Sequence, residues 1–152
     1  MSELEDHLAQ IPHAAAIGMT LVSRGPNSCI VRVPYAPHLV GDPDTGVIHG
    51  GVITALLDNA SGMAVRSDPA EFGEERSMAT LDLRIDYMRP AQPREDLVAE
   101  AECYRMTSNV AFVRAIAYHT DRNDPIASSV ATFMLGTAIA TLAADPSSPQ
   151  RR

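Results

Sequence analysis

The sequence contains no tryptophan and no lysine, so all twelve of its basic residues are arginines. Acidic residues number 19, which gives a formal net charge of -7 at neutral pH. A surface that binds nucleic acid or anionic lipid needs clustered Lys and Arg, and here the arginines are scattered along the chain. We therefore expect neither nucleic acid nor membrane as a partner, although single arginines remain available for the phosphates of a nucleotide carrier.

Long hydrophobic runs and cysteine pairs are also missing. No window approaches the roughly 20 apolar residues of a membrane helix, and the acidic first ten residues lack the basic and apolar regions of a signal peptide. We therefore expect a cytoplasmic protein. Cys29 and Cys103 have no CxxC partner, which predicts two buried free thiols. His13, His38 and His119 are dispersed and show no metal-ligand spacing, so we expect no metal site.

The length of 152 residues suits one domain. We expect that domain over residues 1–136 and a flexible tail over 137–152, where Ala, Ser and Pro accumulate. A helix is predicted over 2–10, a hairpin of strands over 19–24 and 29–33, and further strands over 78–88, 97–106, 110–119 and 126–136. Short, turn-rich links between the last four strands predict antiparallel pairing of neighbours as a meander.

Side chains in the strand predicted over 78–88 alternate in polarity. Ala79, Leu81, Leu83, Ile85 and Tyr87 would lie on one face, and Thr80, Asp82, Arg84 and Asp86 on the other. The pattern predicts a strand that is buried on one side only.

The segment 50–66 has apolar residues at helical spacing. Its opposite face carries small, mostly uncharged residues where a surface helix would show Lys, Glu and Arg. We therefore expect a helix buried on nearly all sides. Two strands, one buried helix and four strands predict an α+β hot-dog fold, in which an antiparallel sheet of five to six strands wraps around a central α-helix.

Asp58 is the only formally charged side chain between Val47 and Val65. Burial of a carboxylate without a cation costs several kcal/mol, so its position within the helix indicates a function. We interpret Asp58 as a nucleophile or general base. The alternative is a carboxylate that accepts hydrogen bonds at a subunit contact.

The tripeptide His49-Gly50-Gly51 comes directly before this helix. Its glycines would lie at the helix N-terminus, where free N–H groups and the helix dipole can stabilise an oxyanion. The alternative is a tight turn without catalytic role, and we expect His49 to fix the loop by hydrogen bonding rather than to act as acid or base. Eight residues separate Gly50 from Asp58, about 12 Å along a helix, which is too far for both to act on one carbonyl carbon. A dimer of antiparallel helices would bring Gly50 of one copy beside Asp58 of the other.

The run GVIHGGVITALLDNASGMAV, followed by SMATLDLRIDYMRPA, resembles the PaaI-like (phenylacetic-acid-degradation type) acyl-CoA thioesterases of the hot-dog superfamily, over about residues 18–136. The resemblance implies that water hydrolyses an acyl-CoA thioester in a homodimer, commonly doubled to a homotetramer, without a cofactor or a metal. It implies Asp58 as the catalytic carboxylate, Gly50 as the oxyanion-hole amide and Thr80 as the hydroxyl that helps to hold the attacking water. Without the resemblance, Thr80 would be interpreted as an ordinary strand threonine.

The resemblance also implies substrate contacts at His49, Gly51 and Asn59, and CoA contacts at Arg89, Pro90, Ser108 and Asn109. For the CoA contacts the alternative is ordinary solvated loop residues. One position departs from the family pattern, because many members carry Asn six residues before the HGG histidine, where this chain has Pro43. Asp42 or Asp44 is a candidate to replace it. Two other functions stay open: a non-catalytic acyl-CoA-binding hot-dog protein, and a hot-dog enoyl-CoA hydratase, which the HGG with its downstream Asp fits less well.

Overall fold

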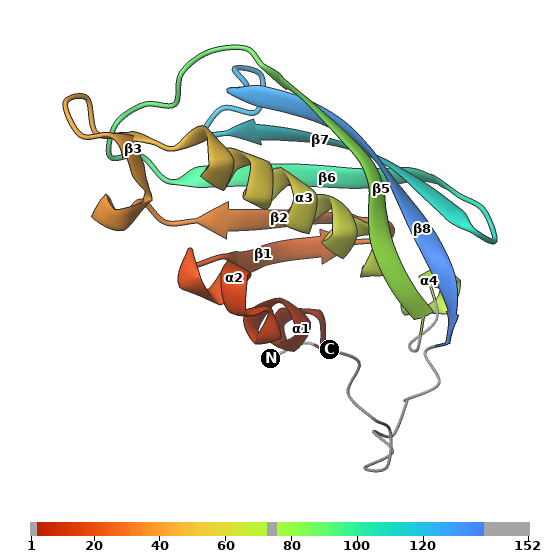
Figure 1. Cartoon of the computed structure of the whole chain (residues 1–152). Coiled ribbons are helices and arrows are strands. Elements are labelled where there is room, and N and C mark those ends of the chain that lie inside the picture. The colour runs from red at the N-terminus through yellow and green to blue at the C-terminus, as the bar shows by residue number, and fades with distance from the viewer. Residues whose placement is uncertain (1–2, 73–75, 139–152) are drawn as a thin grey trace, which may run out of the picture.

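The structure is a computed structural model that describes residues 3–72 and 76–138. A long helix, α3 (Gly50–Arg66), lies against one face of a curved antiparallel sheet (Figure 1). The six strands of this sheet are arranged in the order β1-β2-β6-β7-β8-β5, which confirms the predicted α+β hot-dog fold. Their bounds are β1 Thr20–Gly25, β2 Ser28–Val33, β5 Arg76–Tyr87, β6 Leu97–Met106, β7 Val110–Tyr118 and β8 Ala127–Ala138.

Short elements precede and follow α3. They are α1 (Glu3–Gln10), α2 (Pro12–Ala16), the 3-10 helix η1 (Pro37–Leu39), the ribbon of β3 (Val40–Asp42) and β4 (Val47–Ile48), and α4 (Pro69–Phe72). Pro12 follows the end of α1 and begins α2, because the fixed φ of proline suits a first helical turn. The segment 34–46, which is rich in Pro, Gly and Asp, contains η1 and β3. At the other end, β8 continues to Ala138, and residues 139–152 of the predicted tail lie outside the described residues.

Helix α3 forms the centre of the core because its apolar stripe packs against β2, β6 and β7. Leu56 and Leu57 are fully buried there. The expected burial of the opposite face holds for its C-terminal half, where Ser61 and Val65 are buried. It is wrong for the N-terminal half, where Asp58 is only half-buried, because within the described chain α1 reaches only the later turns of α3.

Both cysteines are buried and form no disulfide, as predicted. Cys29 Sγ donates a hydrogen bond to the Ala60 carbonyl oxygen at 3.2 Å, which ties β2 to α3. Burial raises the pKa of the Cys29 thiol to about 12.

The position of β5 corrects the predicted meander. Strands β6, β7 and β8 do form one, but β5 pairs with β8 and not with its neighbour in sequence, β6. The nine residues 88–96 are too many for a tight hairpin. Their backbone amides form hydrogen bonds with residues at the ends of β8 and β7 instead. The amides of Met88 and Arg89 donate to the carbonyl of Ile126 before β8, and that of Gln92 donates to His119 after β7. The segment therefore crosses the ends of β8 and β7.

A β-bulge in β5 corrects the predicted alternation of side chains. Thr80 pairs with Phe133 and Asp82 with Thr132, so Leu81 is an extra residue without a partner in β8. Met78 and Thr80 lie on the face of β5 that is turned towards α3, and beyond the bulge the odd-numbered residues from Leu83 to Tyr87 lie on that face. Thr80 is therefore not on the outer face with Asp82, as the pattern predicted.

Candidate active site

The HGG segment forms the N-terminal cap of α3. His49 Nδ1 accepts the Gly51 N–H at 2.8 Å, and its carbonyl accepts the Val52 N–H at 2.9 Å. The His49 amide donates to the Leu39 carbonyl at 2.9 Å, so the cap is tied to η1. His49 thus fixes the start of the helix by hydrogen bonding, as expected for a residue before a tight turn.

The Gly50 amide is the N–H of this cap that stays free. Across the described residues no acceptor is placed for it, and an amide in the first turn of a helix has none within the helix. Gly50 is exposed, and the positive end of the dipole adds to the attraction for an anion. The free N–H can therefore donate to an oxyanion that approaches from solvent.

Tyr87 holds the same turn from β5. Its hydroxyl donates to the Gly50 carbonyl at 2.9 Å and lies 2.6 Å from the Thr54 hydroxyl. The sequence had placed Tyr87 only in an apolar strand face. A tyrosine at the end of a predicted strand was the one indication of this role in the sequence. Only the register of β5 shows that the Tyr87 hydroxyl meets the N-terminus of α3.

Asp58 and Thr80 meet between α3 and β5. Thr80 Oγ1 donates to Asp58 Oδ1 at 3.0 Å, and Asp58 Oδ2 is not held by Thr80. No arginine or histidine of the described chain forms an ion pair with Asp58. The bulge at Leu81 makes this contact possible because it turns Thr80 towards α3.

A pocket of about 110 Å³ opens beside the Asp58 carboxylate. The same pocket is lined by Asn59, whose side-chain amide donates to the Ala55 carbonyl one turn back at 2.8 Å. His7 of α1 and Ile11, which lies between α1 and α2, close one side of it. An acyl group attached to a thioester at Asp58 would therefore find space next to the carboxylate.

Gly50 and Asp58 remain apart in the single chain. Helix α3 is continuous between them, and eight residues at about 1.5 Å each separate them by about 12 Å. The chain therefore holds two half-sites, one with Tyr87 behind Gly50 and one with Thr80 against Asp58.

The residues expected to contact CoA lie at opposite ends of the sheet. Arg89 and Pro90 follow β5 at the end where α3 begins, and Ser108 and Asn109 form the turn between β6 and β7 at the other end. The ten residues from Met78 to Tyr87 span about 30 Å of strand. One chain therefore does not bring the two sets together.

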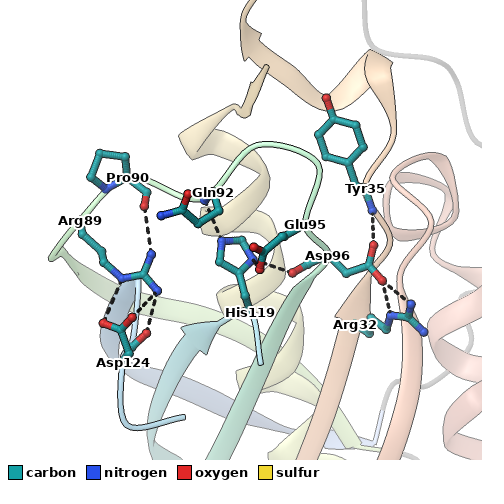
Figure 2. Close-up of polar contacts among 9 residues, drawn as sticks. All are labelled: Arg32, Tyr35, Arg89, Pro90, Gln92, Glu95, Asp96, His119 and Asp124. Atoms are coloured by element: carbon teal, nitrogen blue, oxygen red, sulfur yellow. Dashed lines mark hydrogen bonds and ion pairs between the residues drawn. The ribbon is translucent and has the colours of Figure 1, made fainter. Parts of the chain in front are cut away.

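Arg89 is engaged in an ion pair (Figure 2). Its guanidinium lies 3.1 Å from the Asp124 carboxylate and also donates to the carbonyls of Asp124 and Pro90. At the far turn, the Arg76 guanidinium donates to the Ser108 carbonyl. A phosphate that binds Arg89 would therefore have to displace Asp124.

His119 organises the segment after β5, a role that sequence reasoning missed. The ring is buried, its Nε2 accepts the Gln92 N–H at 2.8 Å, and its Nδ1 lies 2.7 Å from the Asp96 carbonyl oxygen (Figure 2). These contacts place the proton on Nδ1. Asp96 in turn accepts the Tyr35 N–H at 2.8 Å and pairs with Arg32, and these two contacts, the Tyr35 bond first, hold the pKa of Asp96 below its usual value.

Pro43 lies in the exposed turn of the β3–β4 ribbon. Asp42 is engaged in the same turn, where it accepts the Thr45 hydroxyl at 2.9 Å and the Asp44 N–H at 3.0 Å. These bonds, the Thr45 bond first, lower the pKa of Asp42. Asp42, one of the two candidates to replace the family asparagine, is therefore bound within its own turn.

The described ranges contain no group of three or more His, Cys, Asp or Glu that could hold a metal ion. Among the helices of the described chain, none is long and apolar enough to cross a membrane.

Comparisons with known proteins agree on one family. The family model described as Thioesterase superfamily matches residues 45–126. The medium/long-chain acyl-CoA thioesterase YigI of Escherichia coli K12 is 32% identical over 136 residues, which cover 83% of this chain and 86% of that protein. A protein of Halobacterium salinarum that bears an esterase name is 36% identical over 95 residues, and this alignment spans 62% of the present chain and only 61% of the relative's length.

Solved structures share the fold. A crystal structure of a Pseudomonas aeruginosa protein has a TM-score of 0.73 at 40% identity and covers 86% of this chain and 95% of its own. A single-substitution mutant of the phenylacetic acid degradation protein PaaI from Thermus thermophilus has a TM-score of 0.68 at 23% identity and covers 81% of this chain and 97% of its own. The family-model match and the alignment to YigI confirm the resemblance noted from the HGG and TLDLRIDYMRP motifs.

Proposed function

The chain belongs to the thioesterase superfamily and is a thioester hydrolase, and on that premise we propose that it hydrolyses acyl-CoA thioesters to a free acid and CoA. The observation that carries the proposal is the contact between Asp58 and Thr80 beside a pocket. A half-buried carboxylate that is oriented by a hydroxyl and paired with no cation of the described chain is suited to take a proton from water. The thioesterase name of the E. coli relative supports the same substrate class.

In the proposed reaction Asp58 acts as general base. It removes a proton from a water molecule whose oxygen attacks the thioester carbonyl carbon. Thr80 Oγ1 accepts a hydrogen bond from the other O–H of that water. The Gly50 N–H stabilises the resulting oxyanion. Collapse of the tetrahedral intermediate breaks the C–S bond. Asp58 then gives the proton that it took up to the sulfur of the leaving group, and CoA leaves as the thiol. One water is consumed, one acid and one thiol are formed, and no cofactor takes part.

We place each active site across a homodimer, with Gly50 from one copy and Asp58 from the other. The separation of about 12 Å along α3 supports this arrangement. Strand β5 supports it too, because within the described chain its second edge pairs with no strand, and Leu81 and Tyr87 are 52% and 51% exposed. A long edge with apolar side chains favours pairing with another strand. In such a dimer Arg89 and the turn at Ser108 could contact one CoA from different copies.

Asp58→Asn tests the proposal. We expect it to abolish thiol release from a panel of short-chain, medium-chain, long-chain and aryl acyl-CoAs, while the dimer measured by sedimentation stays intact. Asp82→Asn is the matched control, because it removes an exposed carboxylate from the outer face of β5 and should leave turnover unchanged. Unchanged hydrolysis by Asp58→Asn would refute the assignment. If the parent protein bound acyl-CoA and released no thiol, the non-catalytic binding protein would be the better description.

A single turnover in oxygen-18 water tests the role of Asp58. A general base places the label in the released acid in the first turnover. A nucleophile would form a mixed anhydride with the acyl group, and attack of water on its aspartyl carbonyl would place the label in the Asp58 carboxyl group. Label in Asp58 would therefore overturn the general-base role.

A further inference from the structure

The pocket beside Asp58 continues along α3 to a positive charge. Asn59, Gly62, Met63 and Arg66 follow one another at i, i+3, i+4 and i+7, so they share one face of the helix, and all four line the pocket. Arg66 lies eight residues, or about 12 Å, beyond Asp58. The pocket thus has a carboxylate at one end and a guanidinium at the other.

Arg66 has no anionic partner in the part of the chain that the structure describes. None of the ion pairs or hydrogen bonds there involves its guanidinium, whose carbon lies 4.7 Å from the centre of the Phe72 ring. The side chain is half-buried, and burial lowers its pKa, yet an arginine keeps its charge in proteins. A half-buried cation without a counter-charge is unfavourable, so an anion that reached it would be bound strongly.

The walls between the two ends are apolar and leave room for a chain. Met63, Met78 and Phe133 line the pocket. Gly62 lets Met78 pack closely against the helix, because a Cβ there would lie 3.0 Å from Met78 Cε and 3.8 Å from Phe133 Cε1. His7 lies on the same pocket, and burial, followed by the charge of Arg66, lowers its pKa. His7 is therefore neutral at pH 7, which leaves Arg66 as the cation of the pocket.

Arg66 also stands in the last turn of α3, where a cation complements the helix dipole. A dipole role alone is equally well served by a side chain extended into water. Such a role does not explain why the Arg66 guanidinium is shielded from solvent by the Phe72 ring. Nor does it explain why Arg66 lines the pocket that begins at Asp58.

We propose that Arg66 determines specificity by binding a carboxylate at the far end of the acyl group. The substrates would then be CoA thioesters of dicarboxylic acids, with the thioester at Asp58, the methylene chain over Gly62 and the free carboxylate on Arg66. This inference rests on the proposed thioesterase function. It adds a substrate class that the names of the relatives do not contain.

The test compares acyl-CoAs of equal length that differ only at the far end: octanoyl-CoA with suberoyl-CoA, and decanoyl-CoA with sebacoyl-CoA. We expect the wild type to prefer the carboxylate-ended member of at least one pair. In Arg66→Met the ratio of kcat/KM, carboxylate over methyl, should fall by about tenfold to hundredfold, mainly through KM, as expected for loss of a charged hydrogen bond. Arg66→Lys keeps the charge and should retain part of the preference. Arg105→Met removes an exposed arginine from elsewhere on the sheet and should leave the ratio unchanged.

The outcomes separate this inference from the proposed function. If the wild type prefers the methyl-ended member at both lengths, the role of Arg66 is overturned. The thioesterase proposal stays intact in that case. An unchanged ratio in a folded Arg66→Met has the same meaning, and a folded Arg66→Lys serves if the methionine variant does not fold. Equal use of a hydroxyl-ended acyl-CoA would overturn the requirement for an anion. Absence of thiol release from all four compounds and from the wider panel would instead refute the proposed function.

Discussion

Replacement of Thr80 by valine should slow hydrolysis without unfolding the protein. Valine exchanges the hydroxyl that donates to Asp58 Oδ1 at 3.0 Å for a methyl group of similar size. Hydrogen bonds to charged groups contribute about 1.5–3 kcal/mol, which corresponds to a fall of about 10- to 150-fold in kcat/KM. Thr80 is exposed on β5, and valine favours strands, so the free energy of unfolding should change by less than about 0.5 kcal/mol.

A continuous thiol-release assay gives kcat and KM, and urea denaturation gives the stability. The loss should appear mainly in kcat, because Thr80 orients the base and the water rather than the bulk of the substrate. Thr80→Ser keeps the hydroxyl and should recover most of the activity. Thr132→Val removes a hydroxyl from the outer face of the neighbouring strand, opposite Asp82, and should have no effect on turnover.

Two results would refute this reasoning. A kcat/KM for Thr80→Val within twofold of the wild-type value would show that the hydroxyl does not assist the reaction. An equal fall in Thr132→Val would show that the loss comes from a general change in the sheet.

Three more outcomes are expected. Leu56→Ala should lower the free energy of unfolding by about 2–5 kcal/mol in urea denaturation, because Leu56 is fully buried between α3 and the sheet; a change below about 1 kcal/mol would contradict this. The pKa of Asp96 is lower in the folded state than its usual value of 3.8, so Asp96 stabilises the folded state above about pH 3.8, and this contribution is lost as the pH falls through the lower folded-state pKa. Asp96→Asn should therefore flatten that acid limb of stability against pH, and an unchanged limb would show that Asp96 is not responsible. Gly62→Ala should preserve the melting temperature, since alanine favours a helix and the Met78 side chain can move, but should lower kcat/KM for long acyl chains more than for short ones; equal losses at all lengths would place Gly62 outside the acyl path.

The parts of the fold that were predicted correctly are those with local causes. The bounds of α3 coincide with the predicted 50–66, because the helix begins at a His-Gly cap and carries an apolar stripe with its own period. The ends of the strands after α3 were predicted to within two residues. The alternating pattern did not show which of these strands pair. Pairing of β5 with β8 depends on bonds from residues 88–96 to Ile126 and His119, which lie far away in sequence.

The candidate site was predictable in its components and not in its contacts. Asp58 stood out because it is the only charged side chain between Val47 and Val65, and the family motif pointed to Thr80. The alternation of Ala79, Leu81 and Leu83 is unbroken in the sequence, so the bulge becomes visible only when β5 is paired with β8. Tyr87 and Arg66 were missed for the same reason, since their partners, Gly50 and the pocket, belong to other elements.

The unpaired residue in β5 makes the site depend on how that strand pairs as well as on its composition. If Leu81 entered the ladder in regular alternation, every side chain of the strand would still be present, and β5 could still pair with β8. The half of the strand before Leu83 would then be turned over, and Thr80 would face away from Asp58. Substitutions that leave Leu81 unpaired are therefore expected to be tolerated in variants that remain active, whereas changes that bring Leu81 into the ladder should be rare among them.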